Sequence, residues 1–306
     1  MSASLELSAV DSGDLAEVFR VADAARAVDG TDPFNEQARL DAAAGRRESV
    51  LLFAREARTG SADIAVGAAI AGSDELDLVI DPARRGQGYG GEALAALLPR
   101  FTGAVTAWSH GDHPAARALA ARDGFERVRT LLQLEVPLHP SDTASRPSRE
   151  SERADGIRID AFHPGADDAE WVTLNARVFA THPEQGAVTL DDLHDRMAED
   201  WFDADDFLIA RDGAGSMVGY NWLKVEPEDS SASPSREGEI YVIGVDRALG
   251  RRGLGRALMS TGFDRLRERG CTTTTLYVEG DNEPALGLYR SLGFVDRMVD
   301  VQYRRG

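Results

Sequence analysis

The chain has 306 residues, which is enough for two domains of about 150 residues each. It carries 34 basic and 52 acidic residues, so its formal net charge is −18 at pH 7. This charge argues against non-specific binding to nucleic acid or anionic lipid, and the 42% hydrophobic content excludes wholesale disorder. The single cysteine, Cys271, excludes an internal disulfide and is expected to be buried.

The N-terminal segment has neither a basic head nor an apolar core, and no apolar run approaches the ~20 residues of a membrane-spanning helix. The histidines show no metal-ligand spacing. We therefore expect a cytoplasmic protein that uses no metal and has neither a membrane nor a nucleic acid as partner. Lys224 is the only lysine among the 34 basic residues, which makes it a candidate for a role that arginine cannot take.

In the first half, residues 76–100 join a strand-like run to a glycine-rich turn and a helical pattern. Apolar residues recur with helical spacing over 94–101, and Pro99 should end or distort that helix. Residues 138–155 are polar and rich in Ser and Pro, which is typical of a linker.

The second half mixes helical and strand patterns. Its expected elements, in chain order, are helices over 166–181 and 189–200, strands over 207–210, 217–225 and 239–245, a helix from about 253 to 269 that ends at Gly270, a strand over 272–278, a helix with Asn282 as N-cap, and a strand over 295–303. The fold class is therefore α/β with mixed sheets.

The two halves repeat each other in the same order. The spacing from Asp81 to Gly88 equals that from Asp246 to Gly253, and a Gly-Phe pair follows a later helical pattern in both halves. Such repetition indicates that a whole domain was duplicated. The expected parts are an N-terminal domain, a linker and a C-terminal domain, over 1–137, 138–155 and 156–306.

Each half places a run of Gly and Arg, at 85–90 and 250–255, between a strand and a helix. A helix N-terminus presents unpaired N–H groups and the positive end of the helix dipole, and such a turn suits a pyrophosphate. A dinucleotide-binding fingerprint fits less well, because its glycine spacing occurs only in the first half. A P-loop is excluded because no Gly-Lys-Ser/Thr follows. A glycine turn without a ligand is the remaining alternative.

A second motif, NEPALGLYRSLGF, occupies residues 282–294. Together with the glycine turns it resembles the GCN5-related N-acetyltransferases (GNAT). The tandem arrangement, with HPEQG at 182–186 and GEIYVIGVD at 238–246, is similar to the members of that family that make mycothiol. Gly250 departs from the pattern, because the family usually has Gln or Arg there. The resemblance implies two tandem GNAT domains, each a mixed, mostly antiparallel sheet flanked by helices.

The resemblance also implies acetyl-CoA as the co-substrate, bound along strand ends and helix starts. The expected coenzyme contacts are Leu78, Val79, Ile80, Arg85, Gly86, Gln87, Gly88, Tyr89, Gly90 and Gly91 in the first half, and Ile243, Gly244, Val245, Gly250, Arg251, Arg252, Gly253, Leu254, Gly255, Arg256, Asn282, Glu283, Pro284, Ala285, Leu286 and Gly287 in the second. Backbone N–H groups over 243–245 should meet the thioester carbonyl.

Acetyl transfer to an amine needs a base for the ammonium, donors for the oxyanion and an acid for the departing thiolate. Glu239, before the second turn, is the expected base, and the resemblance makes Tyr289 the expected acid. The alternatives are a solvated carboxylate and a core tyrosine. The first half has Asp74 and Ala120 at the matching positions, and alanine cannot donate a proton. We therefore expect transfer in the C-terminal domain, with the N-terminal domain binding acetyl-CoA or acting as a scaffold.

The acceptor that the resemblance implies is the small molecule cysteinyl-glucosaminyl-inositol, acetylated on its cysteine amine by a monomeric enzyme. The expected substrate contacts are Glu36, Glu184, Lys224, Glu239 and Tyr277, each of which has a structural or solvated role as its alternative. Residues 226–238 are expected to form a mobile loop beside the cleft. The competing functions are an N-acetyltransferase for another small amine and a non-catalytic acyl-CoA-binding sensor.

Overall fold

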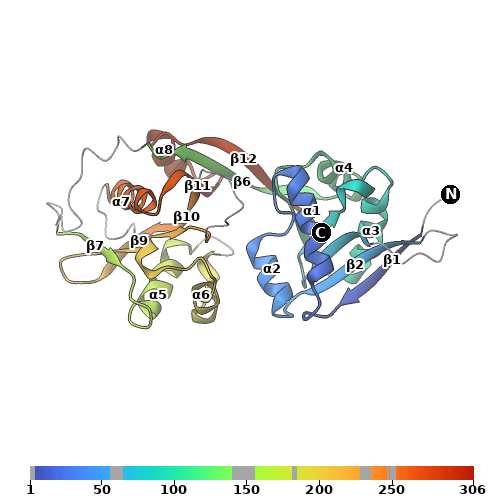
Figure 1. The fold of residues 1–306 in the computed structure, drawn as a ribbon, viewed down its shortest axis with the longest axis horizontal. Helices are drawn as coiled ribbons and strands as arrows, with labels where there is room; N and C mark the ends of the chain where they lie inside the picture. The colour runs from blue at the N-terminus through green and yellow to red at the C-terminus, as the bar shows by residue number, and fades with distance from the viewer. Residues whose placement is uncertain are drawn as a thin grey trace. The chain divides into compact units, whose positions relative to one another are not determined.

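The computed structural model describes residues 4–55, 65–139, 156–180, 185–227, 236–246, 248 and 253–306. The chain forms two compact units (Figure 1). Unit 1 comprises Met1–Leu132, Glu279–Asp281 and Met298–Gly306, and unit 2 comprises Gln133–Val278 and Asn282–Arg297. Of the predicted linker, residues 140–155 lie outside the described part of the chain.

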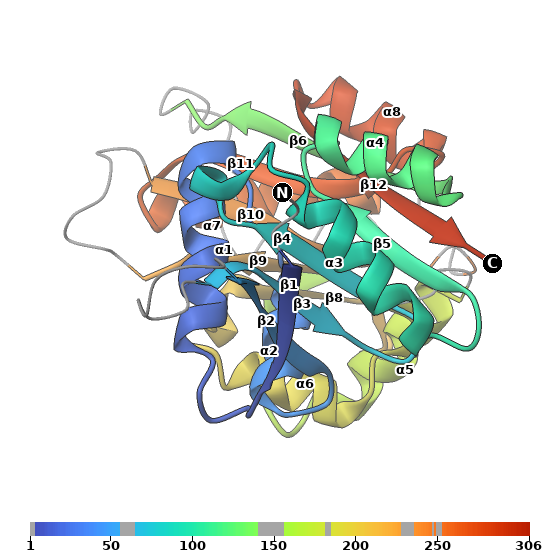
Figure 2. The same ribbon diagram turned by 90° about the vertical axis from the view of Figure 1, so that its right-hand side faces the viewer.

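The first stretch of the chain builds an antiparallel sheet of order β1-β2-β3-β4 with helices on both faces (Figure 2). Its elements are β1 (Ser4–Val10), α1 (Ala16–Asp29), α2 (Glu36–Ala43), β2 (Glu48–Arg55), β3 (Ala65–Ala71), β4 (Leu76–Ile80), α3 (Tyr89–Leu97), β5 (Val105–Ser109), α4 (Pro114–Asp123) and β6 (Glu126–Pro137). One core lies between this sheet and α1 with α2, and the other includes α3.

The second sheet has the strand order β5-β12-β6-β11-β10-β9-β8-β7. The remaining elements are β7 (Arg158–Ala161), α5 (Asp168–Val178), α6 (Leu190–Met197), β8 (Phe207–Arg211), β9 (Met217–Lys224), β10 (Arg236–Val245), α7 (Leu254–Glu268), β11 (Cys271–Glu279), α8 (Glu283–Ser291) and β12 (Val295–Arg305). Residues 301–305 of β12 pair with β5, so the end of the chain completes unit 1.

Helices cover both faces of the sheet in unit 2, with α7 and α8 on one side and α5 and α6 on the other (Figure 1). The core on the α5 side is aromatic. Phe207 stacks on Trp222 with ring centroids 4.3 Å apart, and Trp171 meets both rings edge-on. This dense packing supports β8 and β9 rigidly against α5.

Most predicted elements of the second half are confirmed. Helix α7 ends as expected, since Gly270 follows it with φ +79°, and Asn282 caps α8 by accepting a hydrogen bond from the Ala285 N–H at 3.3 Å. Likewise α3 ends at Leu97 and continues as a short 3-10 turn that contains Pro99. The predicted α/β class is also confirmed.

The predicted start of one strand is wrong, because β10 begins at Arg236 rather than at Glu239. The parallel ladder to β11 extends back to Arg236, which pairs with Cys271, and its Nη1 donates to the Arg269 carbonyl at 2.8 Å. Residues 236–238 of the predicted loop therefore belong to the strand, while 228–235 lie outside the described residues. Cys271 is buried, as expected.

The glycines that directly precede α3 and α7 share one backbone conformation. Gly88 precedes α3 with φ +91° and Gly253 precedes α7 with φ +89°, a region that glycine enters without strain. Upstream of each turn an aspartate caps the backbone: Asp81 accepts from the Ala83 N–H at 3.0 Å, and Asp246 accepts from the Ala248 N–H at 2.9 Å.

Gly262 allows α7 to lie close to β9. A Cβ at this position would come 2.5 Å from Nδ2 of Asn221, which is fully buried and donates to the Leu258 carbonyl at 3.0 Å. The added methyl group should overpack this contact at a cost of about 1–3 kcal/mol. Alanine gains only ~1 kcal/mol over glycine in helix propensity, so we expect Gly262→Ala to lower the free energy of unfolding on balance. Urea unfolding measures this. Gly287→Ala, in α8 with no atom within 4 Å of the added Cβ, is the control and should be neutral or stabilising. Equal stability of Gly262→Ala and the parent would contradict the packing argument.

Candidate active site

The parallel strands β10 and β11 part in the middle of the unit 2 sheet. Over the described residues, the pairs between them end at Ile240 opposite Leu276. β10 continues to Val245 with β9 alone as its partner. One backbone edge of residues 241–245 is therefore left without a neighbouring strand, and its N–H and C=O groups are suited to the amides of an extended ligand.

A helix N-terminus follows each of the parting strands. Because β10 and β11 are parallel, their carboxyl ends meet at one edge of the sheet, and α7 and α8 start from that edge. The first turn of α7 contains no acidic side chain, which favours an anion there. Arg256, in that turn, is exposed and donates to Ser291 Oγ at 2.6 Å.

The structure places most of the predicted coenzyme contacts of the second half on these elements. Residues 243–245 end β10, Gly253 to Arg256 start α7, and residues 282–287 cap and begin α8. Gly250, Arg251 and Arg252 lie outside the described residues. Their contribution to a phosphate site remains an expectation.

Glu239 lies on β10 directly before the strands part. It is opposite Lys224 on β9 and Thr275 on β11, and it is partly exposed. A bulge follows, because the register against β9 shifts between Ile240 and Val242. Bulges redirect side chains next to active sites. Glu239 is thus a paired residue of β10 that lies two residues before the bulged Tyr241.

The Lys224 ammonium is held by two aromatic rings and by an ion pair. Its Nζ lies 4.9 Å from the Trp201 ring centroid and 5.9 Å from that of Tyr241, and it is 3.1 Å from Glu226. The Tyr241 hydroxyl accepts a hydrogen bond from Arg196 Nε at 3.0 Å. Cation–π contacts and the paired strand fix this charge near Glu239.

Sequence reasoning missed the neighbours of Lys224. Trp201 comes from the segment after α6, Tyr241 from the bulge in β10 and Arg196 from α6. The aromatic pair at 201–202 was a detectable signal. Its contact with Lys224 was not, since it depends on how distant segments pack.

Tyr289 is buried on α8, with its ring centroid 5.8 Å from that of Phe294. Burial raises the pKa of its hydroxyl to about 12. The group therefore keeps its proton at neutral pH, as a proton donor must.

The other predicted substrate contacts are placed on different elements. Tyr277 follows Leu276 on β11, just past the last pair with β10, and is 42% exposed. Glu36 is the first residue of α2 and belongs to unit 1. Glu184 lies outside the described residues.

In unit 1, residues of the glycine turn before α3 and of the first turn of α3 make hydrogen bonds within the protein. Arg85 makes two 2.7 Å hydrogen bonds to Asp29, and this pairing lowers the pKa of the Asp29 carboxyl. Arg122 donates to the Gly91 carbonyl at 3.3 Å. The remaining predicted contacts lie on β4 (Leu78, Val79, Ile80), in the turn before α3 (Gly86, Gln87, Gly88) and at the start of α3 (Tyr89, Gly90).

The positions that match the catalytic pair also differ in unit 1. Ala120 is buried in α4, and Asp74 lies in the turn before β4, where its carbonyl accepts from the Thr106 N–H at 2.7 Å. Ala120 offers no proton to a leaving group.

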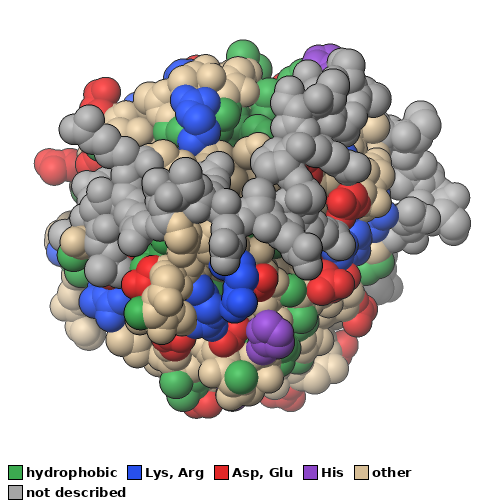
Figure 3. Space-filling model, turned by 90° about the vertical axis from the view of Figure 1, so that its left-hand side faces the viewer, with side chains coloured by type: hydrophobic (Ala, Val, Ile, Leu, Met, Phe, Trp, Pro, Cys, Tyr) green, Lys and Arg blue, Asp and Glu red, His purple; other side chains and the backbone are tan. Residues whose placement is uncertain are grey.

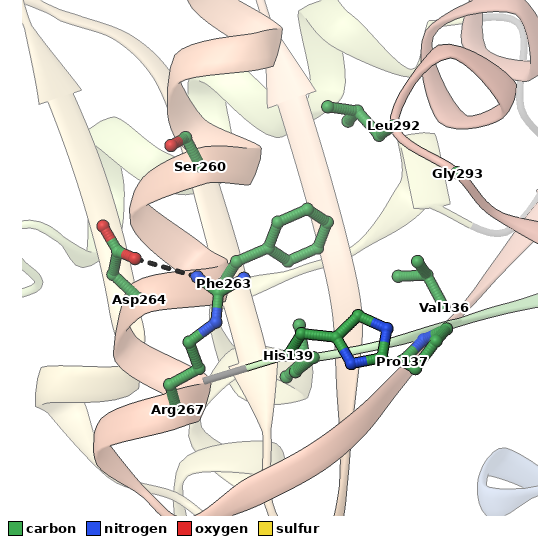
Figure 4. A pocket seen from close by; sticks show the side chains of 10 residues that line it. Val136, Pro137, His139, Ser260, Phe263, Asp264, Arg267, Leu292 and Gly293 are labelled. Atoms are coloured by element: carbon green, nitrogen blue, oxygen red, sulfur yellow. Dashed lines mark hydrogen bonds and ion pairs between the residues drawn. The ribbon is translucent and has the colours of Figure 1, made fainter. Parts of the chain in front are cut away.

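A cavity of about 490 Å³ lies elsewhere in unit 2 (Figure 4). It is lined by the later turns of α7, the end of α8 and the end of β6. The lining residues are Val136, Pro137, Leu138, His139, Ser260, Phe263, Asp264, Arg267, Leu292 and Gly293. Neither Glu239 nor Tyr289 is among them, so this cavity is not the site of the proposed chemistry.

Basic and acidic side chains are interleaved on the face seen in Figure 3. Among the described residues, basic side chains also pair with acidic ones; Arg211, for example, lies 2.5 Å from Asp167 and 2.9 Å from Glu170. In the part of the chain that the structure describes, no helix has the length and apolar character needed to cross a membrane.

Residues 174–294 match the model of the acetyltransferase (GNAT) family, and the parting strands and the two helix N-termini lie within this range. The chain is 46% identical to the mycothiol acetyltransferase of Clavibacter sepedonicus, over 94% of this chain and 91% of that one. With that of Thermomonospora curvata the identity is 43%, over 95% and 93%. The chain therefore belongs to the mycothiol acetyltransferase family.

A solved structure supports the tandem fold. The tandem GNAT protein from the clavulanic acid biosynthesis pathway aligns with a TM-score of 0.67 and 16% identity, over 99% of this chain and 98% of that one. At this identity the likeness concerns the fold alone. The predicted resemblance and tandem GNAT fold class are confirmed.

Proposed function

We propose that the chain transfers the acetyl group of acetyl-CoA to the cysteine amine of cysteinyl-glucosaminyl-inositol, giving mycothiol and CoA. GNAT acetyltransferases use acetyl-CoA, and relatives at 46% and 43% identity are mycothiol acetyltransferases. The observation that carries the proposal is the position of Glu239, on β10 where β10 and β11 part and opposite Lys224.

The proposed reaction begins with an ammonium whose unperturbed pKa is roughly 7.7–8.0. Glu239 removes its proton, directly or through a water, and the free amine attacks the thioester carbonyl. A C–N bond forms, and N–H groups over 243–245 stabilise the oxyanion. The C–S bond then breaks as Tyr289 donates its proton to the departing thiolate, and the second proton, which the attacking nitrogen loses as it becomes the amide, restores the phenol through solvent. Tyr289 is protonated at neutral pH, which this role requires.

We assign catalysis to unit 2 and a binding or scaffold role to unit 1. Ala120 and the position of Asp74 outside a strand support this division. Calorimetric titration with acetyl-CoA measures how many coenzymes bind each chain, and a second equivalent would indicate binding in unit 1.

The direct test is to incubate acetyl-CoA with cysteinyl-glucosaminyl-inositol and follow the free CoA thiol. Turnover supports the proposal. Turnover only with other amines from a panel would make the chain an acetyltransferase for a different acceptor, and binding of acetyl-CoA without any turnover would make it a sensor.

Lys224→Met should weaken acceptor binding selectively. Methionine keeps an apolar stem against Trp201 and Tyr241 but removes the charge. Since a hydrogen bond to a charged group contributes about 1.5–3 kcal/mol, we expect the KM for the acceptor to rise by about 10- to 100-fold, with the KM for acetyl-CoA unchanged. Steady-state kinetics with each substrate varied in turn measures both. Glu226→Gln, which touches Lys224 from an exposed position, is the control for loss of the ion pair alone. An unchanged acceptor KM in Lys224→Met would remove this residue from the substrate site.

A further inference from the structure

One buried amide connects β10 and α7, the two elements of unit 2 that carry most of the predicted coenzyme contacts. Asn221 lies on β9, where it is paired with Ile243, at the open edge of β10. The Asn221 side chain is fully buried, and its Nδ2 donates to the Leu258 carbonyl of α7 at 3.0 Å. Asn221 is therefore bound to the coenzyme strand through its backbone and to the coenzyme helix through its side chain.

The contacts around this amide are apolar. Ile243 and Val245 of β10 pack against a cluster that contains Leu254 and Leu258, from the first two turns of α7. Apolar contacts are non-directional, so by themselves they do not fix how far a helix is shifted along a sheet. A hydrogen bond is directional, and a single buried asparagine can fix the register of helices that pack through apolar side chains.

Two features of this contact lower stability. Gly262 lies in the interior of α7, where glycine is the least favourable residue after proline, and a Cβ there would come 2.5 Å from Asn221 Nδ2. In addition, Asn221 Oδ1 is buried and has no hydrogen-bond partner among the described residues. An apolar side chain at 221 would leave no unpaired oxygen. Stability alone therefore does not account for the amide.

The amide joins two groups of open backbone N–H donors. One group is the edge of β10 over 243–245, and the other is the start of α7, about one turn before Leu258. A coenzyme with amides along the strand and a pyrophosphate at the helix uses both groups at once. It binds most tightly when the distance between them is fixed beforehand, because no ordering is then needed on binding.

We propose that Asn221 is a positioning residue for the coenzyme, which holds the start of α7 at a fixed place relative to the open edge of β10. The inference rests on the proposed function, because it takes acetyl-CoA to bind at these two elements. Asn221 acts through the helix that it holds and not through contact with the reacting atoms.

Asn221→Ala tests the inference, because it removes the amide and retains the backbone pairs of β9. We expect the dissociation constant of acetyl-CoA to rise about tenfold, the upper range for the net contribution of one hydrogen bond. The KM for acetyl-CoA should rise in parallel, while the KM for the acceptor is unchanged. Calorimetric titration and steady-state kinetics measure these quantities.

Leu266→Ala is the matched control for loss of stability. Leu266 is fully buried in a later turn of α7, so its truncation removes core contacts of the same helix and retains the hydrogen bond from Asn221. It should lower the melting temperature and leave the affinity for acetyl-CoA unchanged. An equal loss of affinity in Leu266→Ala would show that any weakening of α7 has this effect, and would overturn the inference.

Gly262→Ala perturbs the same contact from the helix side. If the amide positions α7, the added methyl group should also raise the dissociation constant of acetyl-CoA. In the Asn221→Ala background it should raise it no further, because the amide that it would displace is absent. If Asn221→Ala does not fold, the affinity of Gly262→Ala decides by itself.

The design separates the inference from the proposed function. Coenzyme affinity is measured without any acceptor, so it does not depend on which amine is acetylated. A wild type that binds acetyl-CoA but does not acetylate cysteinyl-glucosaminyl-inositol would overturn the proposed function alone. Wild-type affinity for acetyl-CoA in a folded Asn221→Ala protein would overturn the inference and leave the proposed function standing.

Discussion

Tyr289→Phe is expected to lower kcat by about 10²- to 10⁴-fold, the usual contribution of a general acid or base. The ring remains and continues to pack on Phe294, so the fold and the affinity for acetyl-CoA should be retained. Only the proton for the departing thiolate is lost. Stopped assays of CoA release, with the coenzyme dissociation constant measured by calorimetry, separate the two effects.

The pH profile adds a second check on this residue. Because the pKa of Tyr289 is raised to about 12 and the proposed role requires the protonated form, its ionisation should lower the rate only as pH rises towards 12. Between pH 6 and 10 the deficit of Tyr289→Phe should therefore stay constant. Tyr303→Phe, which loses a hydroxyl in unit 1, controls for removal of a phenol oxygen. A Tyr289→Phe enzyme with normal kcat would rule out the assignment as acid.

Glu239→Gln is the second large effect, and its pH behaviour should be different. The amide cannot accept the proton of the ammonium, so we expect kcat/KM to fall by about 10²- to 10⁴-fold near pH 7. As pH rises through roughly 7.7–8.0, more of the amine becomes free in solution and the base is needed less. The gap between variant and wild type should therefore narrow at alkaline pH.

Glu237→Gln is the matched control for this experiment. Glu237 lies two residues earlier on the same strand, is exposed and pairs with Arg297 at 2.5 Å. The same chemical change there should leave the rate unaltered. A gap for Glu239→Gln that did not depend on pH would point to a binding role for Glu239 instead of proton removal.

Local signals in the sequence were sufficient for much of the fold. The cap at Asn282, the stop at Gly270 and the turns at Gly88 and Gly253 follow from backbone preferences of single residues, and each stands where it was predicted. The catalytic role of Glu239 came from its place before the second turn and that of Tyr289 from the resemblance, and both remain proposals.

Features that depend on distant pairing could not be predicted. The early start of β10 needs Cys271 opposite Arg236, and the bulge at Tyr241 shows only in the register of β10 against β9. The same holds for Lys224 against Trp201 and for the Asn221 amide against the Leu258 carbonyl. No local sequence pattern predicts which residues will be in contact across a hydrophobic core.

The end of β12 makes the two halves of the chain interdependent. Residues 301–305 pair with β5, so severing the chain between the halves would not release a finished N-terminal half. Without β12, the edge of β5 would expose unpaired backbone N–H and C=O groups, which is a known route to aggregation. Loss of the first half would likewise leave residues 301–305 of β12 without β5, so neither half keeps all of its strand pairing when the other is removed.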